Sequence, residues 1–359
     1  MKRLSQCFLF VLLIILWTSS VWAQTEETRE VSSYKQYKGV INKILESAQS
    51  GYDGVYQKLE ILLEKDKKIV VENNPETTGK NINYKEGDKV FLQKYSAENQ
   101  EEKYVITDYN RTGYLFGLFI LFAFMAIAIG KRRGLLSLVA MLISFLTIFK
   151  FTLPQILIGR SPFLITGLSC LFIIPVTFYL SHGFNKKTHV SVVSTLLTLI
   201  ITIIVTAISI SAAKLTGYSS DEAMFLQIAN GTINMRGILL AGIIIGFLGV
   251  LDDVTVSQAN IVFELKRASA NLGTFELYKK AMKIGQDHIA SMINTLILVY
   301  AGASTPLLLL FIGNPQPFAH IINVELIADE VVRTLLGSIG LILAVPLTTF
   351  LASLVADSD

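Results

Sequence analysis

The stretch that decides the fold is Gly237–Glu264, GILLAGIIIGFLGVLDDVTVSQANIVFE, which is long and apolar enough to cross a lipid bilayer. It carries two adjacent carboxylates, Asp252 and Asp253, among apolar neighbours. An ionised side chain at the bilayer centre costs about 3 kcal/mol or more, so such residues usually line a cavity, pair with a partner or carry protons and ions. Adjacent carboxylates also repel, and burial favours a proton on at least one of them. The sequence therefore predicts a proton or cation role for this pair.

Further polar residues follow on the same helix and on the next one. On each helix most of them share one face, at helical spacing. They are Asp253, Ser257, Asn260 and Glu264 on the first helix, and Asp287, His288, Ser291, Asn294 and Thr295 on the second. Because sequential helices are usually neighbours, the two stripes are predicted to face one another or a shared wet crevice. The alternatives are interhelical hydrogen bonds, or charges exposed to water near the cytoplasmic boundary.

Composition indicates a membrane protein. The chain is 52% hydrophobic and 16% charged, against roughly 25% charged residues in soluble domains. Cys7 and Cys170 both lie in apolar runs, which excludes a disulfide framework. The sequence has no Walker loop, cofactor fingerprint or zinc spacing, and no basic cluster with interleaved aromatic residues. We therefore expect no cofactor, no enzymatic activity and no nucleic-acid partner, and the sequence assigns no metal ligands. Intramembrane aspartyl proteolysis is disfavoured, because the residues before the pair read Gly249-Val-Leu-Asp252 rather than GxGD.

The N-terminus has the pattern of a secretory signal. Lys2 and Arg3 precede an apolar run, and the segment ends in Val21-Trp22-Ala23, which resembles a cleavage site except for its bulky middle residue. Residues 1–23 are therefore predicted to be a signal peptide or an N-terminal anchor, and the residues after them to lie outside the cytoplasm.

Residues 24–112 are polar and contain short strand signals separated by turn residues. The predicted strands are Gln57–Leu63, Lys68–Val71, Lys89–Gln93 and Lys103–Thr107, and Val31–Ser47 is compatible with either a helix or a first strand. Several strands at this spacing predict a small β-rich extracytoplasmic domain, for which an OB-like barrel is one candidate. A spacer or protein-contact role is expected for it.

Residues 113–359 are predicted to form a multi-pass, all-α transmembrane domain of about seven helices. The expected spans are 113–130, 134–152, 162–182, 189–213, 236–264, 286–312 and 330–355. With residue 112 outside, the cytoplasmic loops hold ten lysines and arginines and the opposite loops five, which obeys the positive-inside bias. In the fifth span, Gly242 and Gly246 form a GxxxG motif with Gly249 further on, and are predicted to let another helix pack closely.

The segments GILLAGIIIGFLGVLDDVTVSQANIVFEL and KKAMKIGQDHIASMINTLILVYAGASTPLLLLF resemble the YibE/F family of bacterial multi-pass membrane proteins. The resemblance covers roughly the last two thirds of the chain and implies the architecture more than an activity. The acidic helix and its successor are also distantly similar to the acidic span of RND and SecD/SecF-type transporters. That similarity implies proton relay by Asp252 and Asp253, with Glu264 loosely matching a terminal carboxylate. The large porter domain and the second repeat of those transporters are absent from this sequence.

Two functions follow as hypotheses. The first is a proton- or cation-coupled transporter or transport component of the bacterial cytoplasmic membrane, with the β domain outside. The second is a non-transporting membrane scaffold or envelope sensor, whose polar residues are packing elements. Besides the lipid bilayer, the predicted partners are a second copy or a related membrane subunit in a dimer, and a small solute or envelope protein. Dimerisation is expected because the spans hold no deep lysine or arginine to compensate an ionised Asp252 or Asp253.

Overall fold

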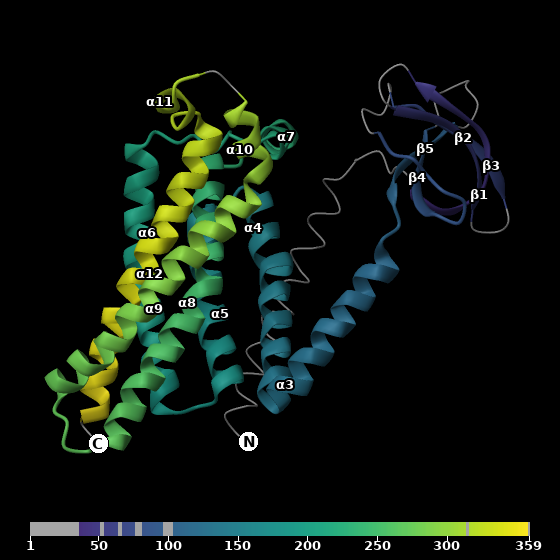
Figure 1. The fold of residues 1–359 in the computed structure, drawn as a ribbon. Helices are drawn as coiled ribbons and strands as arrows, with labels where there is room; N and C mark the ends of the chain where they lie inside the picture. The colour runs from purple at the N-terminus through teal and green to yellow at the C-terminus, as the bar shows by residue number, and fades with distance from the viewer. Residues whose placement is uncertain are drawn as a thin grey trace. The chain divides into compact units, whose positions relative to one another are not determined.

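The computed structural model describes residues 36–50, 54–63, 67–75, 81–95, 103–313 and 316–357. The predicted signal or anchor at residues 1–23 lies outside these residues. The chain divides into two compact units, one spanning Glu26–Ala126 and the other containing Ile127–Asp359. Figure 1 shows a sheet in the first unit and a bundle of helices in the second.

The first unit is a curled antiparallel sheet of five strands in the order β3-β2-β1-β4-β5. Its two edge strands, β3 and β5, also contact one another. The four predicted strands are confirmed, and the described part of Val31–Ser47 is strand rather than helix. The strands are β1 Gln36–Ser50, β2 Gly54–Leu63, β3 Lys68–Asn73, β4 Lys89–Tyr95 and β5 Lys103–Tyr109.

Alternating burial along the strands gives this unit its core. Leu59 and Ile61 of β2 are fully buried, with one intervening residue directed outward, as the two-residue period of a strand requires. Gly39 of β1 packs against Ile61 and Leu92, because an added Cβ would lie 2.5 Å from the Ile61 Cγ2 and 2.9 Å from the Leu92 Cδ1. The buried Gln57 side chain donates to the Tyr84 carbonyl at 3.0 Å and accepts from the Tyr84 N–H at 2.8 Å, which ties the turn segment to the sheet.

The rest of the described chain is mainly helical. The elements are α3 Thr112–Thr147, the π-helix η1 Ile148–Thr152, α4 Leu153–Leu157, α5 Pro162–His182, α6 Lys186–Ala212, α7 Asp221–Ala229, α8 Met235–Ala268, α9 Thr274–Ala303, α10 Thr305–Ile312, α11 Phe318–Ile321 and α12 Glu325–Asp357.

Five helices of the described chain are long and apolar enough to span a membrane, or six if α9 and α10, bent by 70° at their junction, count as one. The prediction of seven divides Thr112–Leu157 into two spans, whereas the total of five counts this run of helical elements as one. The run is interrupted at Lys131, where φ is 50° and ψ is −131°, values outside the helical region. This break coincides with the predicted boundary between the first two spans.

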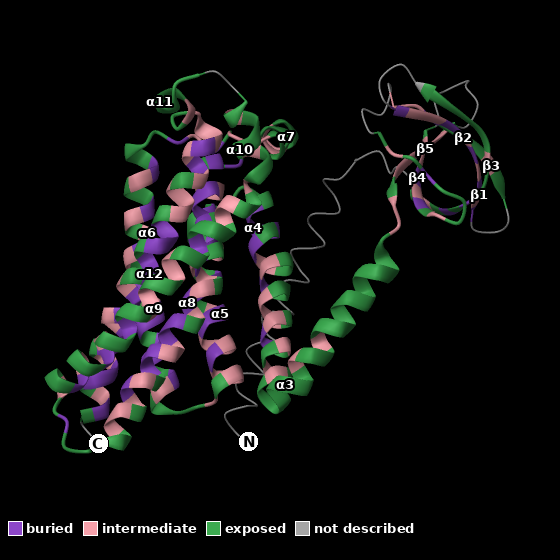
Figure 2. Ribbon diagram, viewed as in Figure 1, coloured by how far each residue is buried: buried purple, intermediate pink, exposed green. Residues whose placement is uncertain are grey.

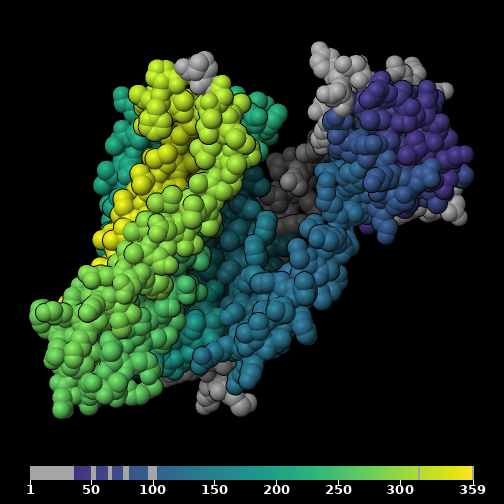
Figure 3. Space-filling view, viewed as in Figure 1, coloured from purple at the N-terminus to yellow at the C-terminus, as the bar shows by residue number. Residues whose placement is uncertain are grey.

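The core of the bundle lies where α8 and α12 meet, with α5, α6 and α9 packed around them. Figure 2 shows the buried positions concentrated on these helices, and Figure 3 shows α9 on an outer face beside α12. Two glycines allow the close approach. An added Cβ on Gly285 of α9 would lie 2.6 Å from the Val345 Cγ1 of α12, and one on Gly340 of α12 would overlap the Phe247 ring of α8.

Candidate functional site

The carboxylate pair lies in the middle of α8. The Asn234 side chain caps the start of this helix by accepting a hydrogen bond from the Gly237 N–H at 3.0 Å. The basic residues Lys266 and Arg267 in the last turn complement the negative end of the helix dipole. These end signals make a helix long enough to carry Asp252 more than three turns away from either end.

The two carboxylates have different surroundings. Asp252 is partly buried, and its Oδ1 atom is buried without a hydrogen-bond partner among the described residues. Asp253 is exposed, and its Oδ1 is 3.5 Å from the Ser257 hydroxyl, which donates to it. Successive helical residues point about 100° apart, so one member of the pair faces the protein and the other faces outward. Asp252 is therefore the member with the environment of a binding group.

Asp252 lines a cavity of about 330 Å³ between α3, α5 and α8. The other lining residues are Ser137, Ala140, Met141, Ser144, Phe145, Ile148, Ile173, Thr177, Phe178, Ser181, His182, Ile245, Leu248 and Gly249. No lysine or arginine of the described chain lines it. Thus the cavity surrounds a carboxylate with apolar groups, hydroxyls and the His182 imidazole, and no lysine or arginine of the described chain is there to neutralise it.

The hydroxyls of this cavity present oxygen lone pairs. Ser144 donates to the Ala140 carbonyl at 3.0 Å, and Thr177 donates to the Ile173 carbonyl at 2.9 Å. A hydroxyl that donates its only proton to its own helix retains acceptor capacity. The arrangement of these oxygens with the Asp252 carboxylate is suited to holding a proton, a hydrated proton or a small hard cation.

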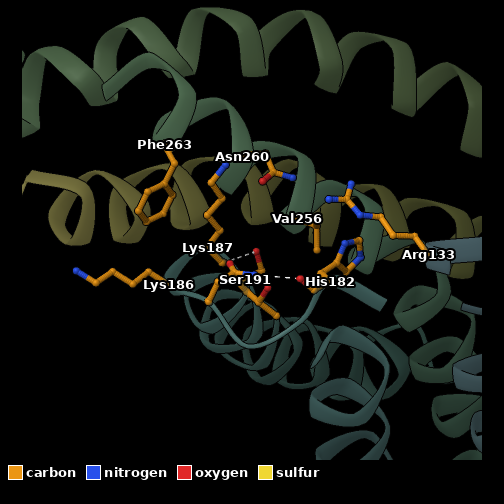
Figure 4. Close-up of a pocket in the computed structure, with 10 residues that line it drawn as sticks. Arg133, His182, Lys186, Lys187, Ser191, Val256, Asn260 and Phe263 are labelled. Carbon is orange, nitrogen blue, oxygen red and sulfur yellow. Dashed lines mark hydrogen bonds between the residues drawn. The ribbon is translucent and has the colours of Figure 1, made fainter. Parts of the chain in front are cut away.

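A second cavity, of about 400 Å³, adjoins the first, since His182 lines both. It is lined by Arg133, His182, Asn185, Lys186, Lys187, Thr188, Ser191, Val256, Asn260 and Phe263 (Figure 4). One predicted site residue, Asn260, lies here rather than beside α9. Glu264 does not line either cavity, and instead accepts from Lys187 at 2.7 Å and from Arg267 at 3.0 Å.

The predicted crevice between the polar stripes of α8 and α9 is not formed in the described chain. Asp287 and Asn294, like Ser291 between them, are exposed, His288 is partly exposed, and no α9 residue lines either cavity. The physical reason is steric. The small Gly285 and the buried Ala281 allow α9 to approach α8 and α12 most closely, which turns the polar stripe of α9 outward.

The buried polar contacts of α8 are made by residues that the sequence did not single out. Gln258 donates to the Ala281 carbonyl of α9 at 3.2 Å and to the Thr349 hydroxyl of α12 at 2.7 Å. The Thr255 and Thr195 hydroxyls of α8 and α6 are 2.8 Å apart. Thr255 also donates to the Leu251 carbonyl at 3.0 Å, so this network holds the turn of α8 that carries Asp252.

A sequence signal for this network exists on α6. Its hydroxyl residues recur every three or four positions on one face, which is the spacing of a helix side that contacts other helices. They are Ser191, Thr195, Thr198, Thr202 and Thr206, and all are buried. By contrast, no local pattern marked Ser137, Ser144 or His182 as neighbours of Asp252, because those contacts join distant segments.

Of the three glycines predicted to pack against another helix, only Gly246 lies beside one in the described chain. A Cβ added to Gly242 or Gly249 would have no atom of another described helix within 4 Å. A Cβ added to Gly246 would lie 3.6 Å from the Tyr300 hydroxyl of α9. Gly249 lines the Asp252 cavity instead. Close packing at Gly242 therefore remains a prediction for contact with another chain.

A separate polar contact fastens the segment before α7 to the start of α12. The Glu325 Oε1 accepts from the Thr216 hydroxyl at 2.7 Å and from the Gly217 N–H at 3.0 Å, and the Ser219 hydroxyl donates to Asp329 at 2.5 Å. Gly217 has a φ of 80°, which favours glycine. Among the described residues, no group of three or more histidine, cysteine or acidic residues is placed to hold a metal ion.

Comparison with models of known protein families gives a match. A family model described as YibE/F-like protein matches residues 118–358, a range that contains both cavities. Curated proteins and solved structures give no match to the chain. Because the match covers more than half of the sequence and includes the helices that build the Asp252 site, the chain belongs to the YibE/F-like family.

Proposed function

We propose that this protein is a proton- or cation-coupled transporter, or a component of one, in the bacterial cytoplasmic membrane. The observation that carries the proposal is the Asp252 carboxylate, which lines a cavity with one oxygen atom left without a partner among the described residues. An isolated ionised carboxylate in an apolar environment is strongly unfavourable. A group retained in such a place has a use, and binding a reversible positive charge is the use that its chemistry supports.

The coupling step is the binding and release of that charge. With no lysine or arginine lining the cavity in the described chain, Asp252 is neutralised by a proton or by a small cation held with the hydroxyl oxygens. We assign to Asp253, which is exposed at the next position of the helix, the exchange of this charge with the surroundings of the protein. His182, which lines both cavities, links the Asp252 cavity to the basic one. Neutralising Asp252 removes its repulsion with Asp253 and changes the packing preference of α3 and α5 around it.

The finer topology belongs to the same proposal. A division of Thr112–Leu157 at Lys131 gives seven spans, with the β domain outside the cytoplasm after a signal peptide or anchor at residues 1–23. The strand order β3-β2-β1-β4-β5, with its edges in contact, supports an OB-like barrel as the form of the extracytoplasmic domain at residues 24–112. We assign to this domain the contact with an envelope protein or with the transported solute.

We also propose that the active form is a dimer, with a second copy or a related membrane subunit. The exposed stripe of α9 includes Asp287, Ser291 and Asn294, and it is followed on the same helix by the exposed apolar residues Ile297, Leu298 and Val299. Polar groups that face lipid are unfavourable, so coverage by another chain stabilises them. The open surfaces at Gly242 and Gly249 support the same interface by allowing close approach.

The decisive experiment compares Asp252→Asn with Asp287→Asn. Both variants replace one carboxylate by an amide of the same size, but only Asp252 lines the cavity. The full-length protein is reconstituted in liposomes containing a pH-sensitive dye, and proton or cation entry is driven by a potassium diffusion potential. We expect Asp252→Asn to slow entry by about tenfold or more, the effect of losing one charge-assisted interaction, and Asp287→Asn to behave as the parent protein.

A second measurement does not depend on transport, so it also applies if proton or cation entry requires a solute that has not been identified. Infrared difference spectra across a pH titration report the protonation of a buried carboxyl without any transport. A carboxyl band that is lost in Asp252→Asn and kept in Asp287→Asn supports the proposal. If entry rates and infrared spectra of Asp252→Asn both match those of the parent protein, the coupling role is wrong, and the scaffold or sensor function takes its place.

A further inference from the structure

The second cavity, at the ends of α5 and α6, has a lining that suits an anion. Cationic side chains reach it from two separate elements, with Arg133 from α3 and both Lys186 and Lys187 from α6, and His182 adds an imidazole from the end of α5. No aspartate or glutamate of the described chain lines it. Its neutral donors include the Asn260 amide of α8 (Figure 4). The lining therefore contains three cationic side chains and, among the described residues, no anionic one.

Arg133 is the strongest anion-binding group in this lining. Figure 4 shows its guanidinium turned toward the Asn260 side chain, with the His182 ring beside it. No carboxylate of the described chain pairs with Arg133, whereas Lys187 is already paired with Glu264 at 2.7 Å. A guanidinium without a carboxylate partner presents a planar fork of donors that matches the oxygens of a phosphate group.

The start of α6 adds to this preference. Its first residue, Lys186, lines the cavity, so the positive end of the dipole of this long helix lies at the same place. The Asn185 side chain caps one backbone donor, the Thr188 N–H, at 3.0 Å. Helix starts of this kind contribute to anion binding when side-chain cations are also present, as they are here.

We propose that this cavity binds a phosphate group, carried by the headgroup of an anionic phospholipid or by a soluble phosphate compound. A volume of about 400 Å³ exceeds what a halide ion needs and is in the range of small-ligand pockets. His182 ends α5 and Lys186 begins α6, so the cavity lies where the apolar helices stop. Basic pockets at that depth, between membrane helices, recognise lipid headgroups.

The test uses the full-length protein in nanodiscs and two probes. Inorganic phosphate binding is followed by phosphorus NMR line broadening in neutral phosphatidylcholine nanodiscs, and phosphatidylglycerol binding is followed by native mass spectrometry. Arg133→Gln is expected to weaken binding about tenfold, and Arg133→Lys, which keeps the charge without the fork, by less. The matched control is Lys279→Gln, which removes one positive charge at an exposed position of α9 that does not line the cavity.

The two probes separate the sources of the phosphate group. If Arg133→Gln binds both probes more weakly, the cavity is a general phosphate site. Weaker binding of the lipid alone supports a headgroup site, and weaker binding of inorganic phosphate alone supports a soluble ligand. Unchanged binding of both probes by Arg133→Gln would overturn the proposal, and so would an equal loss in Lys279→Gln. Thermal unfolding of each variant, measured in parallel, confirms that the compared proteins are folded.

Discussion

Replacing Asp252 by leucine is expected to make the protein more stable and inactive. The Oδ1 atom of Asp252 is buried without a hydrogen-bond partner among the described residues, and a buried polar atom in that state costs about 1–3 kcal/mol. Leucine removes this cost, has a helix propensity better by a few tenths of a kcal/mol, and adds apolar contact with Leu248 and other residues of the cavity wall. The expected gain is about 2 kcal/mol in the free energy of unfolding.

A gain of that size corresponds to a rise of about 4–8 °C in the unfolding temperature for a domain of this length. The buried thiol of Cys170 allows the measurement in detergent with a thiol-reactive fluorescent dye, because the thiol becomes accessible only on unfolding. Asp253→Leu is the control, since Asp253 is exposed and its replacement should change the unfolding temperature little.

The combination of higher stability and lost activity distinguishes a functional carboxylate from a packing element. Functional sites commonly retain groups that lower stability, and replacing them stabilises the fold. A packing element behaves in the opposite way, because its removal breaks contacts. If Asp252→Leu lowers the unfolding temperature by several degrees while Asp253→Leu does not, Asp252 has a structural partner and the reasoning about its unpartnered oxygen is wrong.

Three further outcomes are expected. Gly285→Val should lower the free energy of unfolding by about 1–3 kcal/mol, because the valine side chain would enter the contact between α9 and α12. The control Gly242→Ala places a methyl group in open space and should change the free energy of unfolding little in the same thermal assay. In a protein without other cysteines, Ser144→Cys should react with a small water-soluble thiol reagent, because Ser144 lines the Asp252 cavity, which we expect water to fill. Thr202→Cys, which is buried in the helix core, should not react. Equal labelling of the two variants would contradict a water-filled cavity. Burial raises the pKa of Tyr84 from 10.0 to about 12. The contribution of the neutral phenol to the stability of the β domain is therefore present below pH 10 and is lost as the pH rises through about 12. In an ultraviolet titration, the ionisation near pH 12 should be present in the parent protein and absent from Tyr84→Phe.

The local features of this protein could be predicted from its sequence because they depend on neighbouring residues. Long apolar runs predict helices that span a bilayer, since every backbone polar group must be satisfied within the segment. Short alternating runs predict the strands β2 to β5 for a similar local reason. The prediction of a role for Asp252 also rests on its immediate neighbours, because a carboxylate in an apolar run is unfavourable wherever the helix packs.

Only the tertiary structure decided which faces of the helices meet. The polar stripe of α9 turns outward because Gly285 lets its other side approach α8 and α12 most closely, and steric fit of this kind is not readable from periodicity. The division of the pair into a partly buried Asp252 and an exposed Asp253 depends on where α3 and α5 lie against α8. The neighbours Ser144 and His182 come from segments more than sixty residues away in the chain, so their contribution to the site arises from packing between distant helices, which no local pattern encodes.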